Sequence, residues 1–182
     1  PNTNGAETSS SGAINAFLSN GFTVVDAGET NESGHTYVGW NWNAGGSTVT
    51  NNDGSIESQV RASATAGISI ITYTGTGSDG TIGHGLGVAP SIYIVKRRNS
   101  TKDWYVQIGN LSGIDLGRFL KLNTTDSLNF ASDVFAASAD TSTVLNTKSD
   151  SATNASGDTY VAYCFSEVVG YSKFGKYTGN GN

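Results

Sequence analysis

Residues 154–165 read NASGDTYVAYCF, and a second version of this stretch, NESGHTYVGWNW, occupies residues 31–42. In each version a Ser-Gly turn leads into a run in which aromatic and β-branched residues recur at every second position, which indicates a β-strand. A shorter echo links YTGTG at residues 73–77 with YTGNG at residues 177–181. A repeated turn-and-strand unit is typical of repetitive β architectures, so we interpret the chain as one with a partial internal repeat.

The alternation assigns six bulky side chains to the protein interior. Side chains two residues apart lie on the same face of a strand, and the two versions carry three such groups at matching positions. Burial of each aromatic side chain stabilises a fold by roughly 2–3 kcal/mol. The expected core faces consist of Val38, Trp40 and Trp42 in one strand and of Val161, Tyr163 and Phe165 in the other. Cys164, on the opposite face of its strand, is expected to be a small buried hydrophobe.

The composition favours an all-β protein. Only 14 % of the residues are charged, 24 of the 182 residues are glycine and 10 % are aromatic. Turn-forming residues between aromatic and β-branched runs are typical of short strands joined by turns. We therefore expect an antiparallel β-sandwich of the jelly-roll kind, with roughly eight to ten strands. The expected strands span residues 22–25, 36–42, 67–74, 91–96, 102–108, 116–122, 128–135, 142–145, 158–167 and 171–178, and residues 54–61 could form a further short strand. Residues 13–18 could form either one helical turn or a short strand.

The order of these segments predicts four parts. Residues 1–12, PNTNGAETSSSG, lack apolar periodicity and are predicted to form a flexible arm. Residues 13–46 are predicted to be the tail end of one β unit, residues 47–66 a polar linker, and residues 67–182 a complete β-sandwich domain. Within that domain, the Gly-rich residues 75–87 are predicted to form a loop.

Charge and cysteine content exclude several classes of function. A net charge of −5 does not supply the basic surface that nucleic-acid binding needs, so no nucleic-acid partner is expected. No apolar run reaches the ~18 residues of a membrane span, and we expect no membrane partner. The single Cys164 excludes an internal disulfide and a cysteine-based zinc site. Because no metal-binding motif is present either, we expect no metal and no cofactor.

The sequence carries no recognisable set of catalytic residues. A glycosidase needs two carboxyl groups held about 5–10 Å apart, and the Asp and Glu residues are scattered along the chain. The Gly-x-Ser-x-Gly nucleophile motif is absent. We therefore expect a protein that is not an enzyme. A polysaccharide-degrading enzyme is the catalytic alternative, and it would reveal itself by lowering the viscosity of a host capsule.

Three features are candidates for ligand contact, and each has a plain structural alternative. A histidine between glycines can meet a ligand or bond to the local backbone. A basic cluster can contact acidic glycans or another subunit, or it can be a solvated hairpin end. An aromatic pair can stack on sugars, or one of its members can be buried. The candidate ligand-binding residues are His84, Lys96, Arg97, Arg98, Trp104 and Tyr105, on a surface formed by residues 75–87 and 96–105.

Two strings resemble a known family. They are GHGLGVAP at residues 83–90, with the following alternating strand and the DWY of residues 103–105, and DTYVAYCFSEVVGYSKFGKYTGNG at residues 158–181. Together they resemble a domain of unassigned activity that occurs in tandem in tail-fibre and other structural proteins of bacteriophages, especially marine and cyanobacterial phages. The resemblance covers residues 20–182 and implies an outward-facing, lectin-like virion component without assigned catalytic residues. The first 12 residues and the partial first unit depart from a full repeat.

From these features we expect a bacteriophage virion structural protein on the particle surface, either in a tail fibre or in a capsid appendage. Its expected partners are other virion proteins, further copies of the chain in a trimer or larger assembly, and host-surface glycans bound weakly through many copies. The alternative is a bacterial extracellular adhesin or filament subunit, in which strands from neighbouring chains complete the partial unit.

Overall fold

The computed structural model describes residues 3–8, 14–25, 30–108, 111 and 113–181. The chain divides into two compact units, Pro1–Ala6 with Asn43–Asn182 and Glu7–Trp42, and each is described here by itself. Within the described residues every regular element is a β-strand and every strand pair in a ladder is antiparallel. The predicted all-β, antiparallel fold is therefore confirmed.

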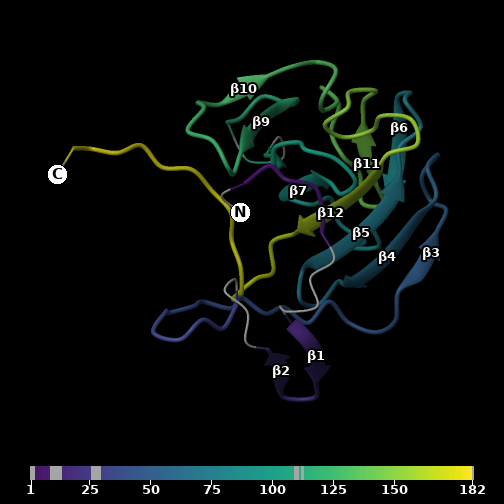
Figure 1. Ribbon diagram of the computed structural model, residues 1–182. Helices are drawn as coiled ribbons and strands as arrows, with labels where there is room; N and C mark the ends of the chain where they lie inside the picture. The colour runs from purple at the N-terminus through teal and green to yellow at the C-terminus, as the bar shows by residue number, and fades with distance from the viewer. Residues whose placement is uncertain (1–2, 9–13, 26–29, 109–110, 112, 182) are drawn as a thin grey trace. The chain divides into compact units, whose positions relative to one another are not determined.

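An eight-stranded sheet forms the frame of the larger unit (Figure 1). The strands of this unit are β3 (Val49–Asn51), β4 (Ser58–Ser63), β5 (Ile68–Thr74), β6 (Gly80–Gly83), β7 (Ile92–Arg97), β8 (Tyr105–Gln107), β9 (Arg118–Lys121), β10 (Asn129–Phe130), β11 (Val144–Thr147) and β12 (Thr159–Phe165). The sheet order is β10-β9-β8-β7-β12-β5-β4-β3, while β6 and β11 form a separate two-stranded sheet. The central strand β12 thus lies between β7 and β5.

The core lies between one face of the large sheet and a second layer that includes β6 and β11. In register across the large sheet, Val60, Ile71, Ala162 and Val95 form a row of buried side chains. The second layer contributes Ile82 from β6, Leu145 from β11 and Phe135 from the segment before β11 to the same cluster. The ring of Phe135 meets the edge of the Tyr93 ring, with 5.5 Å between centroids. Two layers around one apolar core make a β-sandwich, as predicted.

The central strand β12 was predicted from the repeat. The face that it turns toward the core is the one opposite to the predicted face. The buried side chains are those of Tyr160, Ala162 and Cys164, and the half-buried ones on the opposite face are those of Val161, Tyr163 and Phe165. The second layer already supplies bulky groups, so β12 contributes two small side chains and one tyrosine whose hydroxyl finds bonding partners. The predicted core face of β12 is therefore wrong, and the predicted burial of Cys164 is confirmed.

Two segments that were predicted to be a linker and a loop contain strands. The predicted polar linker, residues 47–66, holds β3 and β4, of which β4 overlaps the possible short strand at residues 54–61, and the predicted loop, residues 75–87, holds β6. In β4, Val60 is buried while Gln59 and Arg61 are exposed. Such a strand is hard to recognise in the sequence, because only every second side chain packs against the core and the others are polar. The larger unit, Pro1–Ala6 with Asn43–Asn182, thus includes these strands.

Part of the predicted flexible arm belongs to the larger unit. The carbonyl oxygen of Asn4 accepts a hydrogen bond from the backbone N–H of Lys102 at 2.9 Å, and the carbonyl of Thr3 accepts one from the indole of Trp104 at 3.1 Å. Residues 3–6 are therefore bonded to the larger unit rather than free of it. Residues 1–2 and 9–12 of the predicted arm lie outside the described residues.

The smaller unit contains one antiparallel hairpin, formed by β1 (Ile14–Leu18) and β2 (Gly21–Val24). The predicted strand at residues 22–25 is confirmed in β2. Residues 36–42 lie outside every strand, and Val38, Trp40 and Trp42 are 75 %, 74 % and 53 % exposed. The predicted strand and core face of this segment are wrong. A strand needs neighbours for its backbone N–H and C=O groups, and the alternating pattern alone does not supply them.

The segment that follows β12 is also irregular. An isolated bridge joins Val168 and Ser172, and no strand occurs between residues 173 and 181. Lys176 donates a hydrogen bond to the carbonyl of Gly113 at 2.6 Å, and Tyr177 is 94 % exposed. The strand predicted for residues 171–178 is therefore not formed in the single chain.

Candidate functional site

The basic cluster lies at the end of β7, and Lys96 is turned toward the protein. Lys96 is only 5 % exposed. Its ammonium group donates to the carbonyl of Arg97 at 2.7 Å and to that of Asn4 at 3.4 Å. Through its bond to the Asn4 carbonyl, Lys96 links the segment around Asn4 to β7. Lys96 therefore serves an internal contact rather than presenting its charge to a ligand.

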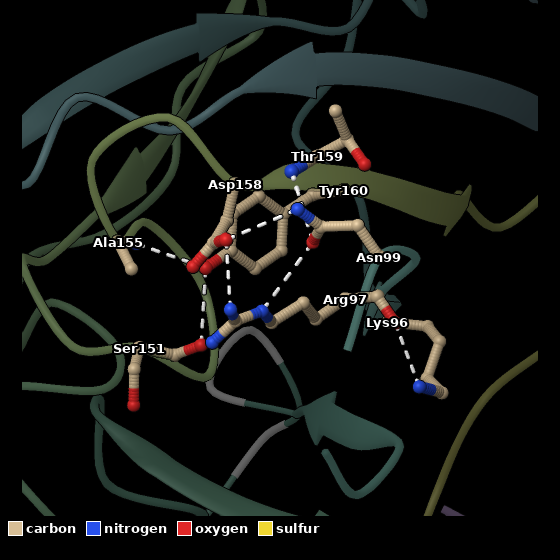
Figure 2. A network of polar contacts seen from close by, with 8 residues as sticks. All are labelled: Lys96, Arg97, Asn99, Ser151, Ala155, Asp158, Thr159 and Tyr160. Carbon is tan, nitrogen blue, oxygen red and sulfur yellow. Dashed lines mark hydrogen bonds and ion pairs between the residues drawn. The ribbon is translucent and has the colours of Figure 1, made fainter. Parts of the chain in front are cut away.

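Arg97 belongs to a polar network at the beginning of β12 (Figure 2). Its guanidinium lies 2.7 Å from the carboxylate of Asp158, and both side chains are less than one-fifth exposed. The amide of Asn99 donates to the same carboxylate at 3.1 Å. Beside it, the Tyr160 hydroxyl accepts from the N–H of Ala155 at 2.9 Å and donates to a backbone carbonyl. The network joins β7 to the turn before β12 and uses the charge of Arg97 internally.

The aromatic pair at β8 divides between the surface and the core. Trp104 is half-buried, and its indole bonds to the carbonyl of Thr3. Tyr105 is 9 % exposed and packs against Phe119, with ring centroids 5.4 Å apart. The ammonium of Lys121 lies 5.7 Å from the centroid of the Tyr105 ring, which is a cation–π contact. Tyr105 is a core residue and does not belong to a contact surface.

His84 is a structural residue in the second layer. It is fully buried, its Nδ1 accepts the backbone N–H of Leu86 at 3.2 Å, and its Nε2 lies 3.1 Å from the carbonyl of Thr141. These two partners require the neutral ring with the proton on Nε2. Burial lowers the pKa of His84, which favours the same neutral form. His84 thus joins two loops and is removed from the predicted contact surface.

Arg98 lines a polar hollow in the larger unit that is a candidate ligand site. The hollow has a volume of about 190 Å³. It lies where β4, β5 and β12 run side by side, on the sheet face opposite the core. Arg98 is tied to this place because its N–H donates to the carbonyl of Thr159 at 2.8 Å. The side chains that surround the hollow are those of Glu57, Gln59, Thr72, Thr74, Arg98 and Thr159.

This group of hydroxyl, amide, carboxylate and guanidinium groups can bind a hydroxyl-rich ligand through several hydrogen bonds. Of the six residues predicted as ligand contacts, only Arg98 takes part in it. The other residues that line the hollow were not predicted, because they come from three segments that are separate in the sequence. The order of the strands in the sheet brings these segments together. The available signal was the run of outward polar residues at every second position in and just before β4, as in Glu57 and Gln59.

Two further searches concern metals and membranes. Among the described residues, no group of three or more His, Cys, Asp or Glu side chains is placed to hold a metal ion. In the same part of the chain, no helix has the length and apolar character of a membrane span.

Comparison with curated proteins found no match, and comparison with solved structures found none. A family model described as "Domain of unknown function (DUF7483)" matches residues 1–182. The match covers both units, including the partial first copy of the repeat. The chain therefore belongs to the DUF7483 family of domains of unknown function.

Proposed function

We propose that this chain is a non-enzymatic structural protein on the surface of a bacteriophage particle, as part of a tail fibre or a capsid appendage. The proposal is supported by the resemblance of residues 83–90 and 158–181 to domains of phage structural proteins. It is also supported by the role of three titratable or charged side chains in the fold. His84, Lys96 and Arg97 are all engaged in contacts that hold the fold together.

The single observation that carries an attachment role is the polar hollow around Arg98. Glycans present many hydroxyl groups, and such groups pair with the amide, hydroxyl and charged side chains found there. A shallow polar site binds weakly, but many copies on one particle convert weak binding into firm attachment. We therefore place host-surface glycan attachment at this hollow, with Arg98 and Gln59 as its central residues.

Mass spectrometry of purified particles tests the setting. Peptides of this chain are expected in the particle fraction at a constant ratio to the major capsid protein. Their recovery only from the bacterial surface would overturn the virion proposal and favour the filament described below.

A glycan array tests the attachment role independently. The wild-type protein, displayed in multivalent form, is expected to retain a subset of host-surface glycans, and Arg98→Ala together with Gln59→Ala is expected to abolish that retention. Arg61→Ala is the matched control, because Arg61 is exposed on β4 but does not line the hollow. Retention that survives the double substitution would place the attachment elsewhere.

A second candidate function is a filament subunit assembled by strand addition between chains. The observation that favours it is the exposed segment 36–42, whose sequence resembles that of the central strand β12. This candidate is compatible with a phage fibre and with a bacterial surface filament, since both consist of many copies.

A further inference from the structure

The two copies of the repeat form the same turn, although only one of them continues into a strand. In the second copy, the N–H of Ala155 donates to the Tyr160 hydroxyl at 2.9 Å, and the N–H of Asp158 donates to the carbonyl of Ala155 at 3.2 Å. In the first copy, the matching N–H of Glu32 donates to the Tyr37 hydroxyl at 2.9 Å.

The backbone of the turn agrees as well. The N–H of His35 donates to the carbonyl of Glu32 at 3.2 Å, which reproduces the bond made by Asp158. Gly34 and Gly157 stand at the same place in the two turns and have φ angles of 82° and 77°. Such positive values favour glycine. Residues 31–37 therefore have the local structure that begins β12, but residues 38–42 do not continue as a strand.

The strand β5, which pairs with β12, also has a sequence counterpart elsewhere in the chain. In the large sheet, β12 pairs with β5, and β5 ends in the YTGTG of residues 73–77. Residues 171–181 end in the matching YTGNG. Residues 173–181 belong to no strand. Tyr171 and Tyr177 in this segment are 70 % and 94 % exposed. One end of the described chain thus carries a β12-like segment and the other a β5-like segment.

We infer that residues 36–42 of one chain pair with residues 172–178 of a second copy, as β12 pairs with β5. The inference deepens the strand-addition assembly proposed above. In the large sheet Tyr160 lies opposite Tyr73, and Ala162 lies opposite Ile71. The repeat alignment carries this register over to the contact between copies. The resulting pairs are Thr36 with Thr178, Tyr37 with Tyr177, Val38 with Lys176, Gly39 with Gly175, Trp40 with Phe174, Asn41 with Lys173, and Trp42 with Ser172.

The tyrosine pair supports this register. The rings of Tyr160 and Tyr73 are stacked with their centroids 5.2 Å apart. Both positions of the proposed contact also hold tyrosine, Tyr37 and Tyr177. An aromatic pair at directly opposite positions is a recognised source of cross-strand stabilisation.

The substitutions between the copies explain why a second chain, rather than a complete second sandwich, is the proposed partner. On the face where β12 contributes Cys164 to the core, the first copy has Asn41. Where β5 has Ser69, the later segment has Lys173. Polar and charged groups at these places suit a face open to water. The opposite face holds Val38, Trp40, Trp42 and Phe174, with Lys176 beside Val38 near the end of the pairing, so the strand pair buries one face only.

Such a contact joins unlike surfaces, so it extends from copy to copy. A head-to-tail contact leaves a β12-like segment at one end of each assembly and a β5-like segment at the other. Further copies can therefore add until the chain of molecules closes into a ring or continues as a filament.

Disulfide trapping with the full chain tests the contact. Gly39→Cys combined with Gly175→Cys places two thiols at opposite positions, where strand spacing suits a disulfide. A Cβ at Gly39 makes ordinary contact with Phe22 at 3.5 Å, and a Cβ at Gly175 has no atom within 4 Å. Mild oxidation is expected to give a ladder of dimers and larger species in non-reducing electrophoresis. The native Cys164 is buried and does not take part.

The matched control combines Gly39→Cys with Gly179→Cys, which moves one thiol four residues out of register, and it is expected to lose the ladder. An equal ladder in the control, a monomer with an internal disulfide, or no product in either variant would overturn the inference. Val38→Cys with Lys176→Cys provides the neighbouring pair if the first variant fails to fold. Failure of this test leaves the particle and glycan experiments unaffected, so the two proposals fail separately.

Discussion

At the scale of single residues, His84 and Asp140 are buried titratable groups of the larger unit whose protonation affects the stability of the fold. His84 bonds on both ring nitrogens and must stay neutral to do so. Asp140 is 7 % exposed, and one of its carboxylate oxygens accepts the N–H of Asn146 at 2.7 Å. The other oxygen has no hydrogen-bond partner. Both groups therefore link the stability of the fold to pH, in opposite directions.

His84→Leu is expected to lower the free energy of unfolding by about 3 kcal/mol, because the N–H of Leu86 and the carbonyl of Thr141 lose their partners inside the protein. Denaturant unfolding followed by intrinsic fluorescence measures the change. His35→Leu is the control, since the His35 side chain is 60 % exposed, and it is expected to change stability by less than about 0.5 kcal/mol. Similar losses in the two variants would contradict the structural role of His84.

Burial raises the pKa of Asp140 from its ordinary value of 3.8 to about 6. The unfolded chain therefore releases this proton at lower pH than the folded protein does. The contribution of Asp140 to the free energy of unfolding falls as the pH rises from about 4 to about 6, by about 3 kcal/mol in total. His84 acts oppositely, because its pKa is lowered and its contribution is lost as the pH falls below about 6.5.

Asp140→Asn removes the contribution of the Asp140 carboxyl to the pH dependence of stability and leaves the contribution of His84. The stability of the variant relative to wild type is expected to be higher at pH 7 than at pH 4 by about 3 kcal/mol. Urea unfolding of both proteins across this range measures the difference, and Asp133→Asn, at an exposed position, is the control. A constant difference between variant and wild type across the range would show that Asp140 does not titrate in this window.

At the scale of elements, β12 determines the larger unit because it pairs with β5 on one side and β7 on the other. Cys164→Asp is expected to abolish the folding of this unit, since it places a carboxylate in a fully buried position. Circular dichroism during heating should show no cooperative transition for this variant. Cys164→Ala, which deletes only a sulfur atom, is expected to lose about 1 kcal/mol. Native-like melting of the aspartate variant would contradict the central position of β12.

A comparison of the individual strands shows what could be predicted from the sequence. β5, β7 and β12 were recognised because aromatic and β-branched residues dominate them. β3 was not recognised, and β4 was predicted only as a possible short strand at residues 54–61, because its outward residues Gln59 and Arg61 are polar. Residues 36–42 have the same pattern as β12, yet in the single chain they form no strand. Periodicity reports the capacity to form a strand, while the strand itself requires a partner that lies elsewhere in the chain or in another chain.

At the scale of the whole molecule, the candidate site could not be found by motif. The polar hollow around Arg98 is assembled from β4, β5, β12 and the residue after β7, in an order that the sequence does not state. The candidate residues that stood out by type, such as His84 and Tyr105, proved to be structural because reactive and aromatic groups also serve the core. The repeat was the feature of the sequence that pointed beyond a single chain.

Hydrogen–deuterium exchange over a series of protein concentrations tests the assembly most directly. The backbone of β12 is expected to be protected at every concentration, because both of its neighbours lie in the same chain. Residues 36–42 and 175–178 are expected to exchange rapidly in dilute solution and to become protected together as the concentration rises, whereas the N–H groups of Ser172 and Phe174 are already bonded within the single chain. Rapid exchange of both segments at all concentrations, or protection of only one of them, would contradict pairing between copies.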